Sequence, residues 1–124
     1  MIPMKIDSFS FGSIAVDGRK YKCDVLIHAD GSTEKRKGGL LMFGSHRITK
    51  ENVERLIHGK TKPDLIIIGL GTASAARVDE DAKKLALDQK IDLIELPSKE
   101  AVEKLNKEWE SKDRKVAALI HVTC

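Results

Sequence analysis

The segment "LIIIGLGTASAARVDED", residues 65–81, decides the fold that we predict for this chain. It follows Pro63 and begins with a continuous apolar run, which is typical of a strand covered on both faces of a sheet. Gly69 and Gly71 end the run, and a helix is predicted at about 79–90 with Asp79 as its N-cap. The stretch therefore predicts a strand, a tight glycine exit and a helix.

The same alternation continues to the end of the sequence. Residues 91–96 and 115–122 are predicted as buried strands, and Ser98 is expected to cap a helix between them. Short crossovers of this kind are right-handed and normally make the strands parallel. The second half of the chain is therefore predicted to be a βαβαβ unit.

The first third has the pattern of antiparallel strands. Apolar and polar residues alternate over 19–28, which predicts a half-buried strand with Cys23 pointing inward. Asp-Gly turn signals at 17–18 and 30–31 lie on either side. We therefore predict an antiparallel hairpin meander over about 11–37, joined to the βαβαβ unit in an α/β fold.

Composition excludes several classes of protein. The 124 residues suit one α/β domain over 1–124, and 41% hydrophobic with 33% charged residues describes a globular chain. No apolar run reaches the roughly 20 residues of a membrane helix. The N-terminus has no secretion or organelle signal, and two cysteines are too few for a disulfide scaffold. We therefore expect a cytoplasmic protein.

The charge pattern argues against nucleic acid as a partner. Basic and acidic residues are interleaved and leave a net charge of only +3. Binding of bases by stacking would also need aromatic residues among the basic clusters. The five aromatic residues are instead predicted to lie mostly in the core, and they are Phe9, Phe11, Tyr21, Phe43 and Trp109.

The glycine exit has two interpretations. Gly69 and Gly71 resemble the start of a dinucleotide fingerprint, and Glu95 ends the next strand, where a ribose-binding carboxylate is expected. The third glycine position holds Ser74, however, and the acidic residues over 79–81 oppose an anion at the helix start. The alternative, a tight turn that allows close helix packing, is favoured.

Parallel strands would bring several polar residues to one sheet edge. Their carboxyl ends would open onto a cleft of the kind in which α/β sheets bind ligands. The residues predicted to line this cleft are Gly69, Gly71, Thr72, Ser74, Arg77, Glu95, Ser98, His121 and Cys124.

Two of these residues have further chemical interpretations. His121 and Cys124 could act as base and thiol nucleophile, or as two metal ligands of an H-x-x-C pair. The alternative is a core histidine bound to backbone and an inert thiol. The spacing offers no third ligand, so no metal and no cofactor is predicted. No catalytic residue is assigned, and the motifs are on balance against an enzyme.

A secondary candidate precedes a helix that Thr49 is expected to cap and Gly59 to end. His46 and Arg47 lie just before the N-terminus of this helix, where a small anion could be held. A solvated capping segment is the favoured alternative. The apolar run "LLMF", residues 40–43, is either packed in the core or exposed for another subunit.

Several motifs together resemble a known family. They are Phe11-Gly12, Tyr21 with Asp24, the Gly69-x-Gly71 loop, "PSKEAV" with Asn106, and the ending "RKVAALIHVTC". They resemble a small α/β family of largely unknown function, first defined from an archaeal Mth protein. The family includes an adipogenesis-associated domain protein and a mitochondrial complex I assembly factor. The resemblance covers nearly the whole chain and implies a three-layer fold around a mixed sheet, but it carries over no catalytic residue.

These observations lead us to predict a non-catalytic interaction or assembly protein, with a protein partner or self-association. The assembly factor in the family, the lack of an active-site motif and the "LLMF" segment motivate this prediction. One alternative is a small-ligand-binding protein or enzyme that uses the sheet edge near the Gly69-x-Gly71 loop and His121. A second alternative is nucleic-acid binding. No membrane partner is expected.

Overall fold

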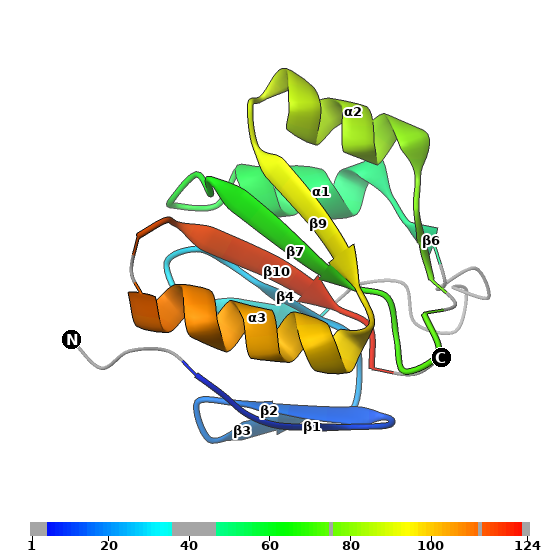
Figure 1. The fold of residues 1–124 in the computed structure, drawn as a ribbon, viewed down its shortest axis with the longest axis vertical. Helices are drawn as coiled ribbons and strands as arrows, with labels where there is room; N and C mark the ends of the chain where they lie inside the picture. The colour runs from blue at the N-terminus through cyan, green and yellow to red at the C-terminus, as the bar shows by residue number, and fades with distance from the viewer. Residues whose placement is uncertain (1–4, 36–46, 75, 112, 123–124) are drawn as a thin grey trace.

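A five-stranded mixed sheet, ordered β5-β4-β10-β7-β9, forms the centre of the computed structural model (Figure 1). The structure describes residues 5–35, 47–74, 76–111 and 113–122. The strands of the central sheet are β4 (Val25–Ile27), β5 (Thr33–Lys35), β7 (Leu65–Gly69), β9 (Asp92–Leu96) and β10 (Val116–Ile120). β7, β9 and β10 are parallel, whereas β4 is antiparallel to β10. The βαβαβ unit and the mixed sheet are both confirmed.

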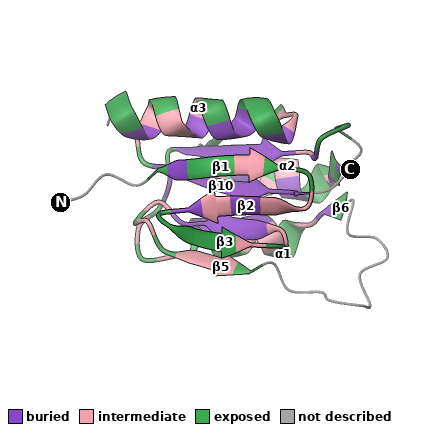
Figure 2. Ribbon diagram, turned by 90° about the horizontal axis from the view of Figure 1, so that it is seen from below, coloured by how far each residue is buried: buried purple, intermediate pink, exposed green. Residues whose placement is uncertain are grey.

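Helices and a second sheet cover the two faces of the central sheet. Figure 1 shows α1 (Lys50–Ile57) and α2 (Glu80–Asp88) on one face and α3 (Ser98–Ser111) on the other. A small antiparallel sheet lies on the α3 side, with strands β1 (Ile6–Ser10), β2 (Ser13–Val16) and β3 (Arg19–Tyr21). Figure 2 shows the buried side of α3 turned towards the strands. The predicted three-layer arrangement is therefore confirmed.

Successive residues of the central strands pack against opposite layers. In β7, Leu65 and Ile67 pack with α3, whereas Ile66 and Ile68 pack with α1 and α2. All four side chains are buried, which explains why the sequence of this strand is a continuous apolar run. As for the helices that the structure describes, none is both long enough and apolar enough to cross a bilayer.

Asn106 joins α3 to the small sheet. Its side-chain oxygen accepts a hydrogen bond from the Ile6 N–H at 2.9 Å, and its side-chain nitrogen donates to the Ile6 carbonyl at 3.1 Å. An amide side chain offers the same donor and acceptor as a peptide group, so Asn106 replaces a neighbouring strand for β1. The small sheet is thus held by hydrogen bonds as well as by apolar packing of Ile6, Ile14 and Val16.

The prediction of one strand over 19–28 is wrong. The chain divides into β3 of the small sheet and β4 of the central sheet, with Cys23 and Asp24 between them. Cys23 is half-buried instead of pointing into the core, and burial raises the pKa of its thiol. The polar and apolar residues before β4 continue the alternation of β3, which hides the break, whereas all three residues of β4 are buried. The meander comprises β1 to β3, whereas β4 and β5 form a hairpin of the central sheet.

The helix starts agree only in part with the predictions. Thr49 caps α1 as predicted, because its hydroxyl accepts from the Asn52 N–H and the Asn52 side chain accepts from the Thr49 N–H. Asp79 occupies the N-cap position of α2 but makes no side-chain cap bond. Its carboxylate instead binds the Arg47 guanidinium at 2.8 and 3.1 Å. The pairing of β6 (Arg47–Ile48) with β8 (Arg77–Val78), which was not predicted, brings these two side chains together.

The aromatic residues also differ from the prediction. Trp109 is buried, and Phe9 and Tyr21 are half-buried, whereas Phe43 lies outside the described residues. Phe11 is 65% exposed at the turn between β1 and β2, so its predicted core position is wrong. A residue at the tip of a hairpin extends past the layer that its strands pack against, and this accounts for the exposure.

Candidate functional site

The carboxyl ends of β7, β9 and β10 meet at one sheet edge, and Ser98 connects them. The Ser98 hydroxyl accepts a hydrogen bond from the Gly71 N–H at 2.8 Å and donates to the His121 carbonyl at 2.6 Å. The Ser98 N–H donates to the Gly71 carbonyl at 3.0 Å. The prediction that Ser98 caps α3 is wrong, because Ser98 is the first residue of that helix and its buried hydroxyl joins two other segments.

A buried histidine–carboxylate pair lies beside this bridge. His121 is 1% exposed, and its Nδ1 lies 2.7 Å from Oδ2 of Asp24. The Val122 N–H donates to the other oxygen of Asp24 at 3.0 Å, and the His121 N–H donates to the Gly69 carbonyl at 3.0 Å. Because a carboxylate only accepts hydrogen bonds, Nδ1 of His121 is the donor in this pair. Asp24 lies where the chain passes from the small sheet to the central sheet, and it thereby links this segment to the residues that follow β10.

Asp24 had no predicted role at this edge. The signal was a charged residue directly before the fully buried strand β4, within an otherwise regular alternation. A charge in that position needs a partner. The sequence does not reveal the partner, because His121 is 97 residues further along the chain.

The surrounding structure explains why positions 69 and 71 of the loop are glycines. A Cβ on Gly69 would lie 2.8 Å from the Ser98 hydroxyl and 3.2 Å from the Ser98 Cα, so only glycine allows α3 to approach this closely. Gly71 has a φ of 102°, which side chains rarely tolerate, and its N–H already binds Ser98. These contacts favour the tight-turn interpretation. Phosphate binding by the loop was the less favoured interpretation of the sequence and is not tested by these contacts.

Four other predicted cleft residues are exposed at the surface. Thr72 and Ser74 are exposed on the loop after Gly71, and Arg77 is exposed on β8. Glu95 turns to the α2 side of the sheet, where its carboxylate lies 3.5 Å from the Lys83 ammonium. Of the predicted cleft residues that the structure describes, Gly69, Gly71, Ser98 and His121 are joined by hydrogen bonds or close contact at this edge.

Two predicted candidates cannot be placed. Cys124 and His46 lie outside the described residues, as does the "LLMF" segment, so the H-x-x-C pair and the anion site stay predictions. Arg47, the second residue of the anion candidate, binds Asp79. Within the described ranges, no group of three or more His, Cys, Asp or Glu side chains could hold a metal ion.

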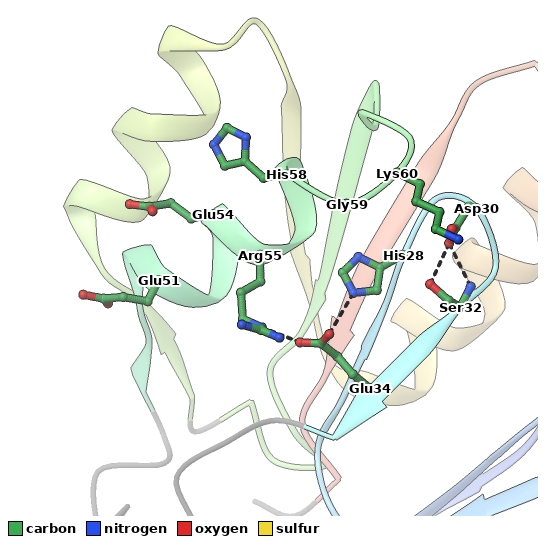
Figure 3. A pocket seen from close by; sticks show the side chains of 10 residues that line it. All are labelled: His28, Asp30, Ser32, Glu34, Glu51, Glu54, Arg55, His58, Gly59 and Lys60. Atoms are coloured by element: carbon green, nitrogen blue, oxygen red, sulfur yellow. Dashed lines mark hydrogen bonds and ion pairs between the residues drawn. The ribbon is translucent and has the colours of Figure 1, made fainter.

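A second site, which the sequence did not predict, is a cavity of about 590 Å³ between the β4–β5 hairpin and α1 (Figure 3). The hairpin contributes four charged or polar side chains, and the helix contributes three charged ones. They are His28, Asp30, Ser32 and Glu34, and Glu51, Glu54 and Arg55. The turn over 58–60 lines the end of the cavity where the helix stops.

Glu34 is the electrostatic centre of this cavity. One of its oxygens accepts a hydrogen bond from Arg55 Nε, and the other lies 3.3 Å from Nε2 of His28. The hydrogen bond from Arg55 is the main reason that the pKa of Glu34 is lowered. The Asp30 carboxyl has a lowered pKa as well, chiefly because the Ser32 N–H binds it at 2.9 Å. Both carboxylates are therefore ionised at neutral pH.

His28 lies in the wall of the cavity with one nitrogen unsatisfied. The residue is 8% exposed, and its Nδ1 is buried without a hydrogen-bond partner in the part of the chain that the structure describes. Gly59 covers this atom so closely that a Cβ there would lie 2.9 Å from Nδ1. A carboxylate only accepts hydrogen bonds, so Nε2 is the donor to Glu34, and Nδ1 is the ring nitrogen that stays unsatisfied.

The sequence did contain a signal for this cavity. Polar residues at 51, 54, 55 and 58 recur at helical spacing, which is typical of a solvated helix face. The opposing residues, His28 and Glu34, belong to a hairpin, and no local pattern shows that the hairpin packs beside this helix. Only the strand order of the central sheet brings the two together.

The sequence matches, over residues 6–121, the family described as "Protein of unknown function (DUF498/DUF598)". The chain belongs to this family. A protein named MT938 shares 35% sequence identity, with a TM-score of 0.78 and coverage of 98% of this chain and 99% of that one. A conserved hypothetical protein, PH1505 from Pyrococcus horikoshii OT3, shares 29% identity, with a TM-score of 0.83 and coverage of 97% and 99%.

A more distant structure gives the same fold. A protein from Bordetella pertussis, described as an Mth938-like domain, has a TM-score of 0.72 at 10% identity, covering 95% of this chain and 85% of that one. The Mth-type family that the sequence motifs resemble is thus confirmed. No curated protein matches the chain.

Proposed function

We propose that this protein is a non-catalytic interaction or assembly protein, and that Phe11 marks the surface with which it binds a protein partner. The observation that carries the proposal is the exposure of Phe11, 65% at the tip of the β1–β2 hairpin. Large aromatic side chains are enriched at the centres of protein interfaces. Burying this ring against a partner would contribute about 2 kcal/mol.

Phe11 is attached to a rigid part of the molecule. Gly12, with a φ of 83°, completes the two-residue turn, and its N–H donates to the Val122 carbonyl at 2.6 Å. This bond ties the hairpin tip to the end of β10. A ring on a fixed backbone loses little conformational freedom on binding, so more of its burial energy becomes affinity.

Two further points support an interaction role. The hydroxyl of Ser98 and the carboxylate of Asp24 bind other parts of the chain and so stabilise the edge beside Phe11. The resemblance to a family with an assembly factor agrees with such a role. The alternatives, a small ligand at the edge near Gly71 and His121 and a nucleic acid, stay predictions.

The proposal can be tested with two matched surface variants. Leu87, 75% exposed on α2 at the opposite side of the central sheet, serves as the control for Phe11. Tagged wild type, Phe11→Asp and Leu87→Asp would be used to capture proteins from native extract. The partner would then be purified and its Kd measured by calorimetry. We expect a stoichiometric partner that binds wild type and Leu87→Asp equally and Phe11→Asp at least tenfold more weakly.

Three results would contradict the proposal. They are capture of no partner, a partner whose Kd is the same for Phe11→Asp as for wild type, and self-association alone in analytical ultracentrifugation. Circular dichroism of both variants checks that the fold is unchanged, which is expected because both side chains are exposed.

A further inference from the structure

We infer that the partner of the Phe11 surface carries an acidic segment, which binds a group of exposed lysines beside Phe11. They are Lys20 in β3, Lys22 directly after β3, and Lys35 in β5, and we call them the lysine patch. The inference rests on the proposed interaction role, because it gives the chemistry of the partner that Phe11 binds. It follows from the position of the patch, its charge and the side chains around it.

The fold assembles the lysine patch from two segments of the chain. The hydroxyl groups of Tyr21 and Thr33 are hydrogen-bonded at 2.7 Å, which holds β3 beside β5 (Figure 2). Thr33 and Lys35 are two residues apart in β5, so their side chains lie on the same side of the strand, towards β3. Burial raises the pKa of the Cys23 thiol, and the Lys35 ammonium opposes this rise. The charge of Lys35 therefore acts on the residue directly after Lys22.

The lysine patch lies at the same end of the small sheet as Phe11. β2 runs away from the turn that carries Phe11, and β3 returns towards it, because the two strands are antiparallel with Ile14 opposite Tyr21. Lys22 follows β3 and so comes back to the Phe11 end. The Tyr21 ring packs against the core, so Lys20 and Lys22 on either side of it point outward. A partner that covers the Phe11 ring therefore also meets these lysines.

The charges of the lysine patch are not neutralised within the chain. Among the described residues, no carboxylate forms an ion pair with a lysine of the patch, whereas Lys104 on α3 lies 3.1 Å from Glu108. The carboxylates of Asp7 and Asp17 bind backbone N–H groups at the opposite end of the small sheet. Three exposed cations thus lie together beside Phe11, and they attract a negatively charged surface.

An acidic protein segment fits this surface better than a nucleic acid does. Proteins that bind single strands stack the bases on exposed rings among their basic residues. The ring between the lysines, that of Tyr21, is half-buried, and its hydroxyl is bound to Thr33. The exposed ring is Phe11 at the hairpin tip, which suits an apolar pocket at the centre of a protein interface. Acidic side chains at the rim of that pocket would face the lysine patch and favour the correct partner.

Decaglutamate is the probe for the test, so the result does not depend on capture of the partner. The full chain, ¹⁵N-labelled and at low salt, would be titrated with this peptide and followed by NMR. We expect saturable binding with shifts centred on the amides of Lys20, Lys22 and Lys35. Raising the salt concentration should weaken the binding, because salt screens exposed charges. Single-stranded oligothymidylate of the same length is the comparison, and tighter binding of this DNA at the same amides would overturn the inference.

A pair of double variants separates the lysine patch from a general charge effect. Lys20→Gln with Lys22→Gln removes two charges from the patch, and Lys50→Gln with Lys84→Gln removes two from exposed positions of α1 and α2, on the other face of the central sheet. We expect the Kd for decaglutamate to rise about fivefold in the first and less than about twofold in the second. An equal rise in both, or shifts scattered over lysines of the whole surface, would overturn the inference.

The acidic class of the partner and the interaction role of Phe11 fail separately. A captured partner that needs Phe11 but has the same Kd for wild type and for Lys20→Gln with Lys22→Gln would leave the interaction role standing and overturn the acidic class. A partner whose Kd is unchanged in Phe11→Asp but rises in the lysine variant would support the lysine patch and overturn the role of Phe11.

Discussion

Two buried histidines of this protein bind carboxylates, with opposite results. His121 is 1% exposed and its Nδ1 lies 2.7 Å from Asp24, in an edge where neighbouring polar groups are bound to one another. His28 is 8% exposed and its Nε2 lies 3.3 Å from Glu34, but its Nδ1 has no partner among the described residues. In the first region, the sheet edge around Ser98 and His121, polar groups bind one another, and we call it the closed region. In the second, the cavity beside His28, a buried ring nitrogen is unsatisfied, and we call it the open region.

The second oxygen of each carboxylate accounts for this difference. In Asp24 it accepts from the backbone N–H of Val122, directly after the histidine, so the pair becomes part of the sheet. In Glu34 it accepts from the side chain of Arg55, which is 48% exposed. The two pairs therefore differ in the partner of the second oxygen, which is a backbone N–H in one and a side chain in the other. A histidine–carboxylate pair does not by itself indicate a reaction.

The largest effect is expected from Gly69→Ala in the closed region. The new Cβ would lie 3.2 Å from the Ser98 Cα, and this backbone cannot move without shifting α3. The loss of unfolding free energy should be about 3 kcal/mol, measured by urea denaturation. In the open region, Gly59→Ala is the matched variant, and its Cβ meets only the ring of His28, which can rotate. We expect a loss of about 1 kcal/mol there. Equal losses would mean that the two regions are equally rigid.

A smaller effect is expected from Ser98→Ala. This change leaves the Gly71 N–H and the His121 carbonyl without their hydroxyl partner in a buried position. The expected loss is about 2 kcal/mol in urea unfolding, since each unsatisfied buried group costs free energy. The control is Ser10→Ala, whose hydroxyl binds Ser13 at the exposed surface and should cost less than about 0.5 kcal/mol. If both variants lose equally little, the hydroxyl bridge does not close the edge.

The closed region was largely predictable because its strands carry strong patterns. The apolar runs over 65–69 and 116–120 indicated the parallel strands, and parallel strands brought Gly71, Ser98 and His121 to one edge. The role of Ser98 was not predictable in the same way. A serine at a helix start is typical of an N-cap, and only tertiary packing turns its hydroxyl towards the strands.

The open region was not predictable from local patterns. Its cavity depends on where the chain leaves the small sheet, and the alternation over 19–28 continues through that point. The polar face of α1 had the pattern of a solvated surface, and the exposure of Glu51 agrees with that pattern. This pattern does not reveal that the β4–β5 hairpin lies opposite the polar face of α1. The antiparallel pairing of β4 with β10 places the hairpin there. Long-range pairing of this kind leaves no signal in a single sequence.

The smallest effect is expected from Glu34→Gln in the open region. Its effect on the free energy of unfolding should depend on pH. The pKa of Glu34 is lowered from its ordinary value of 4.5, so the folded state favours the ionised form. This stabilisation is present above pH 4.5 and is lost as the pH falls through the lowered pKa. At pH 7 the variant should therefore be less stable than wild type, by less than about 1 kcal/mol because the carboxylate is partly solvated. This difference in unfolding free energy between variant and wild type should disappear at acidic pH.

Urea unfolding of both proteins at several pH values between neutral and acidic would measure this gap. Other carboxyls with lowered pKa values, such as those of Asp30 and Glu108, are common to both proteins and cancel in the difference. Glu103→Gln, on the exposed face of α3, controls for the loss of a charge alone. A gap that stays constant with pH would show that Glu34 acts through its shape and not through its charge. His28 would then be held in place by packing. The two carboxylates would not explain why the surroundings of His28 and His121 differ.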